Sequence, residues 1–193
     1  MTNQDADSFF EECRARAAQY PGSPLADAAR AFMEASTRPK YSYNFTWLSR
    51  PIIQYPQDIV AMQELIWRVR PDLIVETGIA HGGSLVLSAS MLALLDYCDA
   101  AASGRSLDPR ASRRRVLGVD KDIRAHNRGA IEGHPLAHHI EMIEGSSIVP
   151  DVIARVRAFA TGYERVLVYL DSNHTHAHVL AELEAYAPLA TVD

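Results

Sequence analysis

The feature that most constrains this chain is the stretch from Pro71 to Ser84, where an apolar segment leads into a glycine-rich turn. Residues 73 to 77 form a short segment of mostly apolar or β-branched side chains, which predicts a buried strand with Glu76 near its end. Glycines follow at positions 78, 82 and 83, and an apolar helical pattern then begins. In α/β proteins this order presents backbone N–H groups to a nucleotide. The alternative is an ordinary strand-to-helix turn that needs glycine for its positive φ.

The spacing of the turn distinguishes two kinds of nucleotide site. It is Glu-x-Gly-x-x-x-Gly-x-Ser from Glu76 to Ser84, and alanine stands at position 80, where the dinucleotide fingerprint has its second glycine. The pattern resembles the first motif of S-adenosylmethionine-dependent methyltransferases instead. There the glycines let the backbone approach the amino acid end of the cofactor.

Length, charge and cysteine content narrow the class of protein. A chain of 193 residues has the length of one domain, and its net charge of −5 argues against nucleic acid as the main ligand. The polar, acidic start is not a signal peptide, and no apolar run approaches the roughly 18 residues of a membrane span. Cys13 and Cys98 are far apart, so neither a disulfide framework nor a zinc site is indicated. We expect a cytoplasmic protein without membrane partners.

The first 56 residues differ in pattern from the rest. Residues 5 to 35 predict two helices, broken at positions 21 to 24, whose apolar faces serve packing or a subunit contact. Residues 38 to 56 have no helical period and are dense in aromatic side chains. These side chains either cap the core or form a lid over a site. The candidate substrate or lid residues are Tyr43, Trp47, Gln54 and Tyr55.

From residue 57 onward, helical and strand patterns alternate. Helices are predicted at 57–70, 83–99, 124–132, from 150, and at 175–186, and strands at 73–77, 115–120, 140–143 and 164–171. Residues 100–114 predict a surface loop, in which the basic run 113–115 is a solvated connection. Apolar strands without a polar face indicate a parallel sheet covered on both sides. We expect N-terminal helices and a lid over 1–56 and a Rossmann-like domain over 57–193.

Polar side chains stand at the carboxyl end of each predicted strand. They are Glu76, Asp120, Ser146 with Ser147, and Asp171. Ligands of parallel sheets bind at this edge, and an acidic residue after the second strand can accept the ribose hydroxyls of an adenosine. One strand-end aspartate is most often a helix cap. Polar residues at four successive strand ends, after a glycine turn, favour a binding site.

Four stretches together resemble the cephalosporin hydroxylase and rhamnosyl O-methyltransferase family, whose members have the class I methyltransferase fold. The stretches are 41–47, 50–58, 76–84 and 170–176. The resemblance implies S-adenosylmethionine as cofactor and favours the lid interpretation of the aromatic segment. The cofactor contacts it implies are Glu76, Gly78, His81, Gly82 and Ser84 in the turn, Asp120 at the ribose, and Ser146 and Ser147 near adenine.

A more distant resemblance to catechol O-methyltransferase concerns the last strand end. It implies that Asp171 binds a magnesium ion, which takes one or two carboxylates together with substrate oxygens and waters. His174 occupies the position of that enzyme's basic lysine, and its ordinary pKa lies nearer neutral pH. Two departures stand out. Ala177 replaces an expected acidic residue, and the family's further metal carboxylates follow a fifth strand that this chain does not reach.

Two other functions are open at this point. His174, His176 and His178 alternate, and with Asp171 they could imitate a two-histidine, one-carboxylate iron site. Alternate residues share a face only on a strand, however, and this segment leaves a strand for a helix. The second alternative is an accessory protein that binds S-adenosylmethionine without turnover. Dependence on 2-oxoglutarate would favour the iron site, and cofactor binding without methyl transfer would favour the accessory role.

The sequence therefore predicts a magnesium-assisted O-methyltransferase of secondary metabolism that works as a homo-oligomer. Its substrate is a small-molecule hydroxyl on a sugar, a polyketide or a phenol. The predicted fold is an α/β, Rossmann-like class I methyltransferase sheet, truncated after its fourth strand, with an N-terminal helical segment. Because residues 166–170 would then form an exposed apolar edge, we expect the chain to belong to a longer protein or to have a partner subunit covering it.

Overall fold

The computed structural model describes residues 3–191, which fall into two compact units, Met1–Ser42 and Tyr43–Asp193. The first unit holds α1 (Asn3–Ala18) and α2 (Pro24–Thr37), as the sequence predicts. Ser23 caps α2 by accepting a hydrogen bond from the Ala26 amide at 3.2 Å, and proline occupies the first turn.

The second unit begins with structure that the sequence pattern did not indicate. After the short helix η1 (Tyr41–Tyr43), β1 (Phe45–Trp47) and β2 (Arg50–Ile52) form an antiparallel hairpin. Leu48 and Ser49 make its turn with φ values of 44° and 71°. A hairpin turn with this left-handed geometry usually contains Asn-Gly. That dipeptide is absent here, so no local sequence pattern predicted the hairpin. The hairpin belongs to the second compact unit, although the sequence grouped it with the N-terminal helices.

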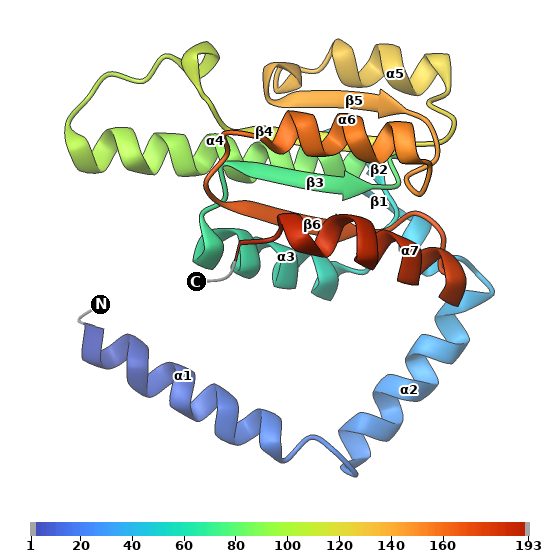
Figure 1. Ribbon diagram of the computed structural model, residues 1–193. Helices are drawn as coiled ribbons and strands as arrows, with labels where there is room; N and C mark the ends of the chain where they lie inside the picture. Colours follow the sequence, from blue (N-terminus) through green and yellow to red (C-terminus); the bar gives the residue numbers. More distant parts are fainter. Residues whose placement is uncertain (1–2, 192–193) are drawn as a thin grey trace. The chain divides into compact units, whose positions relative to one another are not determined.

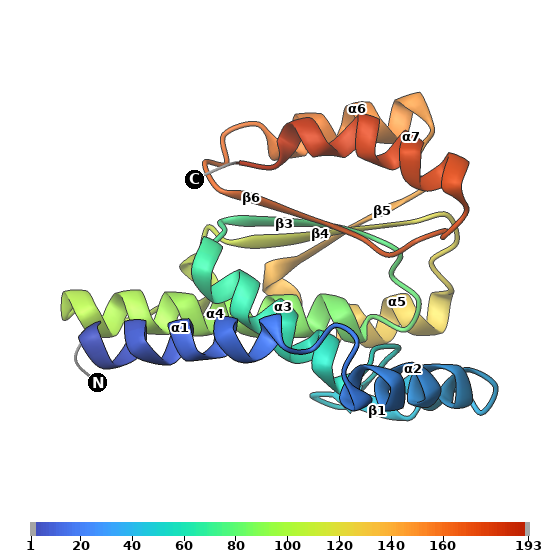
Figure 2. The ribbon, with the colours of Figure 1, turned by 90° about the horizontal axis from the view of Figure 1, so that it is seen from below.

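The centre of the second unit is a parallel sheet, which confirms the predicted class of fold. Its strands run in the order β5-β4-β3-β6, and Figure 2 shows α3, α4 and α5 on one face and α6 and α7 on the other. The strands are β3 (Leu73–Thr77), β4 (Arg115–Asp120), β5 (Ile140–Glu144) and β6 (Val166–Leu170). The helices are α3 (Pro56–Val69), α4 (Gly83–Ser103), α5 (Ala125–Glu132), α6 (Pro150–Ala160) and α7 (His176–Tyr186) (Figure 1).

Side-chain alternation along the strands builds a core on each face of the sheet. Ile74 and Val116 pack with Leu92 of α4 on one face. Leu73, Val75, Leu117 and Val119 pack with Val156 of α6 and Tyr186 of α7 on the other. Because helices cover both faces, β3 and the interior of β4 are buried on both sides, as is usual for the central strands of parallel sheets.

The helix α4 extends to Ser103 rather than ending at residue 99. Gly104 stops it with a left-handed φ of 64°, and its amide bonds back to the carbonyl of Ala101. Among residues 3–191, α4 is the helix that is long and apolar enough, by length and composition, to cross a membrane. Core helices meet the same test, and Leu85, Leu92 and Leu95 of α4 are fully buried in the core.

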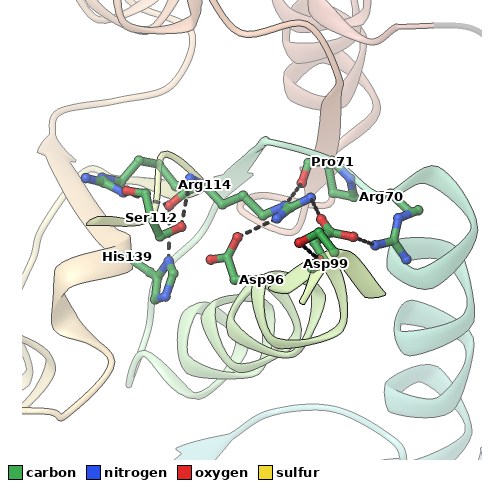
Figure 3. A network of polar contacts seen from close by, with 9 residues as sticks. Arg70, Pro71, Asp96, Asp99, Ser112, Arg114 and His139 are labelled. Atoms are coloured by element: carbon green, nitrogen blue, oxygen red, sulfur yellow. Dashed lines mark hydrogen bonds and ion pairs between the residues drawn. The ribbon is translucent and has the colours of Figure 1, made fainter. Parts of the chain in front are cut away.

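The basic run at 113–115 is not simply a solvated connection. Arg114, whose side chain is 17% exposed, donates hydrogen bonds to Asp96 and, at 2.8 Å, to Asp99, both on α4 (Figure 3). Arg70 at the end of α3 also binds Asp99. The sequence pattern could not indicate this, because the partners lie 15 and more residues away.

At the opposite edge from β5, β6 pairs with β3. Its first residue, Val166, also exchanges hydrogen bonds with Thr191, at 3.2 Å and 3.1 Å. Residues 167–170 are half-buried. The expectation that this edge is completed by further chain or by a partner stays a prediction.

Candidate active site

A cavity of about 380 Å³ opens at the carboxyl ends of the strands, which is where parallel sheets bind ligands. Its size lies within the range of about 300–1,000 Å³ that is usual for small-molecule sites. The lining residues come from the ends of all four strands and, for His178, from α7: Gly78, Val119, Asp120, Lys121, Ser146, Ser147, Ser172, Asn173, His174 and His178. The cavity thus brings together six of the residues that the sequence singled out, five of them as cofactor or catalytic candidates and His178 as a candidate iron ligand.

Glycine is required at two positions of the turn between β3 and α4. Gly78 has a φ of +91°, and a Cβ there would lie 2.1 Å from the carbonyl oxygen of Asp171. Gly82 has a φ of +83°, and a Cβ there would lie 2.5 Å from the side chain of Ile131. The turn therefore needs glycine both for its backbone conformation and for its close approach to neighbouring segments.

Asp120 supports the turn and also forms part of the cavity wall. Its Oδ2 accepts hydrogen bonds from the amides of Ile79 at 2.8 Å and Ala80 at 3.2 Å. Its Oδ1 accepts from the Asp122 amide at 3.2 Å. The carboxylate thus holds the turn from the neighbouring strand, and the same residue lines the cavity.

Two residues that the sequence did not single out hold the carbonyls of the same turn. Arg50 of β2 donates to the carbonyl of His81 through Nε at 3.1 Å and through Nη2. Asn127 of α5 is buried and donates from Nδ2 to the carbonyl of Ala80 at 2.9 Å. The hairpin and α5 therefore fix the shape of the turn. His81 lines a second cavity, of about 280 Å³, together with Asp120 and Asn127.

Glu76 and Ser84 lie against each other inside the domain rather than in the cavity lining. The Ser84 hydroxyl donates to Oε1 of Glu76, which is fully buried, and Oε2 has no hydrogen-bond partner within residues 3–191. Burial raises the pKa of Glu76 to about 8; the hydrogen bond from Ser84 opposes this rise and the charge of Asp171 adds to it. Glu76 therefore carries a proton at neutral pH.

Asp171 is the centre of a polar group at the end of β6. Its Oδ2 accepts a hydrogen bond from Gln54 Nε2 at 2.8 Å and one from the Tyr169 hydroxyl at 3.4 Å. His174 Nε2 lies 3.6 Å from Oδ1. Burial raises the pKa of Asp171 above its ordinary value, while His174, Tyr169 and Gln54 oppose the rise.

The residues at Asp171 do not form a complete metal site. Across residues 3–191, no group of three or more His, Cys, Asp or Glu side chains is placed to hold a metal ion. This also means that His174, His176 and Asp171 are not gathered as an iron triad. Magnesium prefers oxygen ligands, and the Oδ2 atom of Asp171 already accepts hydrogen bonds from Gln54 and Tyr169.

The candidate lid residues take different places. Trp47 packs against the core and donates from Nε1 to the Ser90 hydroxyl at 3.0 Å, as the core-capping alternative describes. Tyr43 is 55% exposed. Tyr55 is half-buried at the start of α3, and Gln54 binds Asp171.

Ser172 and His178 also line the cavity and Glu182 lies next to them, although the sequence pattern predicted none of the three as a cofactor contact. Glu182 of α7 is 1% exposed and binds the hydroxyls of Ser147 and Ser172. One sequence feature could have indicated His178 and Glu182 as site residues. They are four residues apart, which places both on one face of a helix that follows a strand end.

The strand order, the glycine turn and the cavity at the carboxyl ends define a Rossmann-like α/β protein of the class I methyltransferase type. The profile of the family described as Rhamnosyl O-methyltransferase/CmcI matches residues 39–193. The chain belongs to this family.

Curated relatives and a solved structure agree with this assignment. The rhamnosyl O-methyltransferase of Mycobacterium leprae (strain TN) is 24% identical over 151 residues, covering 76% of this chain and 56% of the relative. That of Mycobacterium bovis (strain BCG / Pasteur 1173P2) is 26% identical over 137 residues, covering 68% and 46%. The chain thus spans about half the length of these relatives. A solved structure described as cmcI-D160 Mg-SAM shares the fold with a TM-score of 0.50 and 15% identity, covering 75% of this chain and 53% of that one.

Proposed function

We propose that this chain binds S-adenosylmethionine and belongs to an O-methyltransferase that acts on a hydroxyl of a small molecule. The observation that carries the proposal is the cavity whose wall joins the glycine turn at Gly78 to Asp120 and Ser147. Among a sugar, a polyketide and a phenol, the relatives named rhamnosyl O-methyltransferase favour a sugar hydroxyl as acceptor. We further propose that it works in the cytoplasm, in secondary metabolism, as a homo-oligomer.

The described residues fit this cofactor in size and in chemistry. A cavity of about 380 Å³ accommodates a nucleoside with an amino acid arm. Asp120 lies where strand-end acidic residues accept ribose hydroxyls, and Gly78 leaves room for close approach at the other end. When bound, S-adenosylmethionine supplies a methyl group on a positively charged sulfur, which an oxygen nucleophile attacks.

The chain's own part in such a reaction is to orient the acceptor and receive its proton. His174 lines the cavity, and its Nε2 lies 3.6 Å from Asp171 Oδ1. An imidazole in this position can take the proton of an acceptor hydroxyl, and the neighbouring carboxylate stabilises the resulting cation. Gln54 and Tyr169 hold the carboxylate through Oδ2, which leaves Oδ1 for His174.

Asp171 is the residue that we propose as a magnesium ligand. The ion takes one or two protein carboxylates and completes its shell with substrate oxygens and waters. Asp171 would be its ligand from the described part of the chain. The proton transfer to His174 does not depend on it.

The test compares His174→Ala with His176→Ala, a control on an exposed histidine two residues further along. Methyl transfer to rhamnosides and phenols is measured with and without magnesium, and S-adenosylhomocysteine affinity is measured by calorimetry. Loss of a general base lowers turnover by about 10²–10⁴-fold. We expect this loss in His174→Ala alone, with cofactor affinity nearly unchanged.

Each other outcome has a separate meaning. Full turnover in His174→Ala would place the base elsewhere. Cofactor binding without transfer to any acceptor would support the accessory role, and a chain that binds neither S-adenosylmethionine nor S-adenosylhomocysteine would contradict the proposal.

A further inference from the structure

The first compact unit, Met1–Ser42, has no apolar core among the residues whose side chains the structure describes. Every large apolar or aromatic side chain between positions 7 and 42 is at least 36% exposed. These side chains are Phe9, Phe10, Tyr20, Leu25, Phe32, Met33 and Tyr41. Helices of 16 and 14 residues, such as α1 and α2, are only marginally stable in water without packing against another surface. The unit therefore does not itself supply the packing that its helices need.

The apolar side chains of α1 form a stripe of the kind that packs against another helix. Phe9, Cys13 and Ala17 follow one another at intervals of four residues, which places them on one face. Phe10 borders the same face, and its ring meets that of Phe9 edge to face, with the centroids 5.9 Å apart. Both rings are more than half exposed. The stripe thus contains a pair of uncovered aromatic rings.

Two opposite charges flank the stripe on the same side. Asp7 and Arg14 are seven residues apart, which is close to two helical turns, so their side chains project in nearly the same direction. Both are exposed, and neither takes part in an ion pair among the described residues. Arg16, by contrast, pairs with Glu12 of the same helix at 3.2 Å. The midpoint between Asp7 and Arg14 lies next to Phe10, beside the aromatic pair.

A second copy of α1, running antiparallel, satisfies these features together. A two-fold axis beside Phe10 brings the flank that carries Asp7 and Arg14 against the same flank of the other copy. Asp7 of each copy then lies opposite Arg14 of the other, and the aromatic rings of both copies meet at the centre. The arrangement is self-complementary, which favours a second copy of this chain over a different protein.

We propose that α1 is a dimerisation helix, which packs antiparallel against α1 of a second copy through its aromatic centre and the charges of Asp7 and Arg14. The matching family profile begins at residue 39, so α1 lies outside the part of the chain that the profile describes. Aromatic side chains at the centre and charges at the rim are the usual anatomy of a protein interface. The inference identifies a surface for the proposed homo-oligomer and does not depend on the proposed methyl transfer.

The experiment measures the dimer dissociation constant of the full chain by sedimentation equilibrium. Arg14→Asp places an acidic residue opposite Asp7 at both symmetry-related contacts, and Arg155→Asp makes the same charge change at an exposed position of α6. Each exposed ion pair is weak, but the reversal turns two attractions into two repulsions. We expect the dissociation constant to rise about tenfold in Arg14→Asp and to stay within about twofold of the native value in Arg155→Asp.

A charge exchange tests the antiparallel pairing itself. The double variant Asp7→Arg with Arg14→Asp carries the same charges in exchanged positions, so it should dimerise more tightly than Arg14→Asp alone. A mixed dimer of this variant with the native chain would place like charges together at both contacts. We therefore expect mixed dimers to be scarce in native mass spectrometry with one chain isotopically labelled, and mixed dimers at the statistical proportion would overturn the inference.

A further variant, Phe10→Glu, tests the aromatic centre. A carboxylate placed there should weaken the dimer at least about 100-fold, and circular dichroism reports whether the variant is folded. An unchanged dissociation constant in Arg14→Asp or in a folded Phe10→Glu overturns the inference and leaves the proposed homo-oligomer intact. A native chain that is monomeric overturns both, and leaves the proposed methyl transfer intact.

Discussion

The two ends of the central sheet both carry polar networks, but the networks are built from different groups. At the amino end, Arg114 pairs with Asp96 and Asp99, and Arg70 pairs with Asp99 (Figure 3). At the carboxyl end, Glu182 binds two serine hydroxyls beside a cavity. The amino end pairs opposite charges between elements, and the carboxyl end combines one carboxylate with hydroxyl and imidazole groups.

The amino-end network connects elements that are far apart in the chain. It joins the end of α3, the C-terminal half of α4 and the residue before β4, and His139 Nδ1 donates to the Arg114 carbonyl at 3.1 Å. Burial alone would raise the pKa of Asp99, but Arg114 and Arg70 outweigh it and hold that pKa below its ordinary value. Paired charges of this kind stabilise the fold and leave little capacity for a ligand.

The difference teaches how one sheet separates stability from binding. Charges that neutralise one another at the amino end keep α3, α4 and β4 in place. At the carboxyl end, hydrogen bonds orient hydroxyls whose remaining lone pairs face a cavity. Substitutions at the amino end should therefore change the free energy of unfolding, and substitutions at the carboxyl end should change ligand binding.

The largest expected effect is on stability, from Arg114→Ala. Truncation leaves Asp96 without its ion-pair partner and Asp99 with Arg70 alone. Breaking a buried ion pair costs about 3–5 kcal/mol of unfolding free energy, and we expect a loss at the lower end of this range because these side chains are partly buried. Urea denaturation measures the loss, and cofactor affinity of the folded fraction should stay the same. Arg113→Ala, at the exposed neighbouring position, should stay within about 0.5 kcal/mol of the native chain. A loss below 1 kcal/mol in Arg114→Ala would show that this network does not stabilise the fold.

The second-largest expected effect is that of Asp120→Ala on the binding of S-adenosylmethionine. The change removes both a cavity carboxylate and the acceptor for the Ile79 and Ala80 amides. S-adenosylmethionine affinity should weaken by about 1–3 kcal/mol, the cost of leaving polar partners unpaired. Asp122→Ala, at an exposed position two residues further on, is the control. Unchanged affinity by calorimetry in Asp120→Ala would remove Asp120 from the site.

The smallest effect is a pH dependence that comes from the carboxyl end. Glu76 has a native pKa of about 8, so between its ordinary pKa and pH 8 the folded chain holds a proton that the unfolded chain releases. Its contribution therefore lowers the unfolding free energy by about 1.4 kcal/mol when the pH rises from 6 to 7. Glu76→Gln should remove this slope in urea denaturation at both pH values. If native chain and variant lose stability in parallel, Glu76 is ionised in the folded chain.

The elements of the sheet were predictable because their signals are local. The strand expected at residues 115–120 is β4 (Arg115–Asp120), and the helix expected from Pro150 is α6. Side-chain periodicity and prolines at helix starts act within a few residues, so a sequence displays them directly. The parallel topology then places the strand ends at one edge, which is why Gly78, Asp120 and Ser147 could be assigned to one site.

The direction in which each polar group points was decided by the tertiary structure. Asp120 turns toward the glycine turn, Glu76 lies buried beneath Ser84, and Glu182 reaches two serines that are 35 and 10 residues away. Arg50 and Arg114 likewise find partners on distant elements. Such contacts depend on how helices pack on the sheet, and packing is a property of many residues at once. The sequence by itself determined which strand ends meet, and helix packing decided what each polar group there binds.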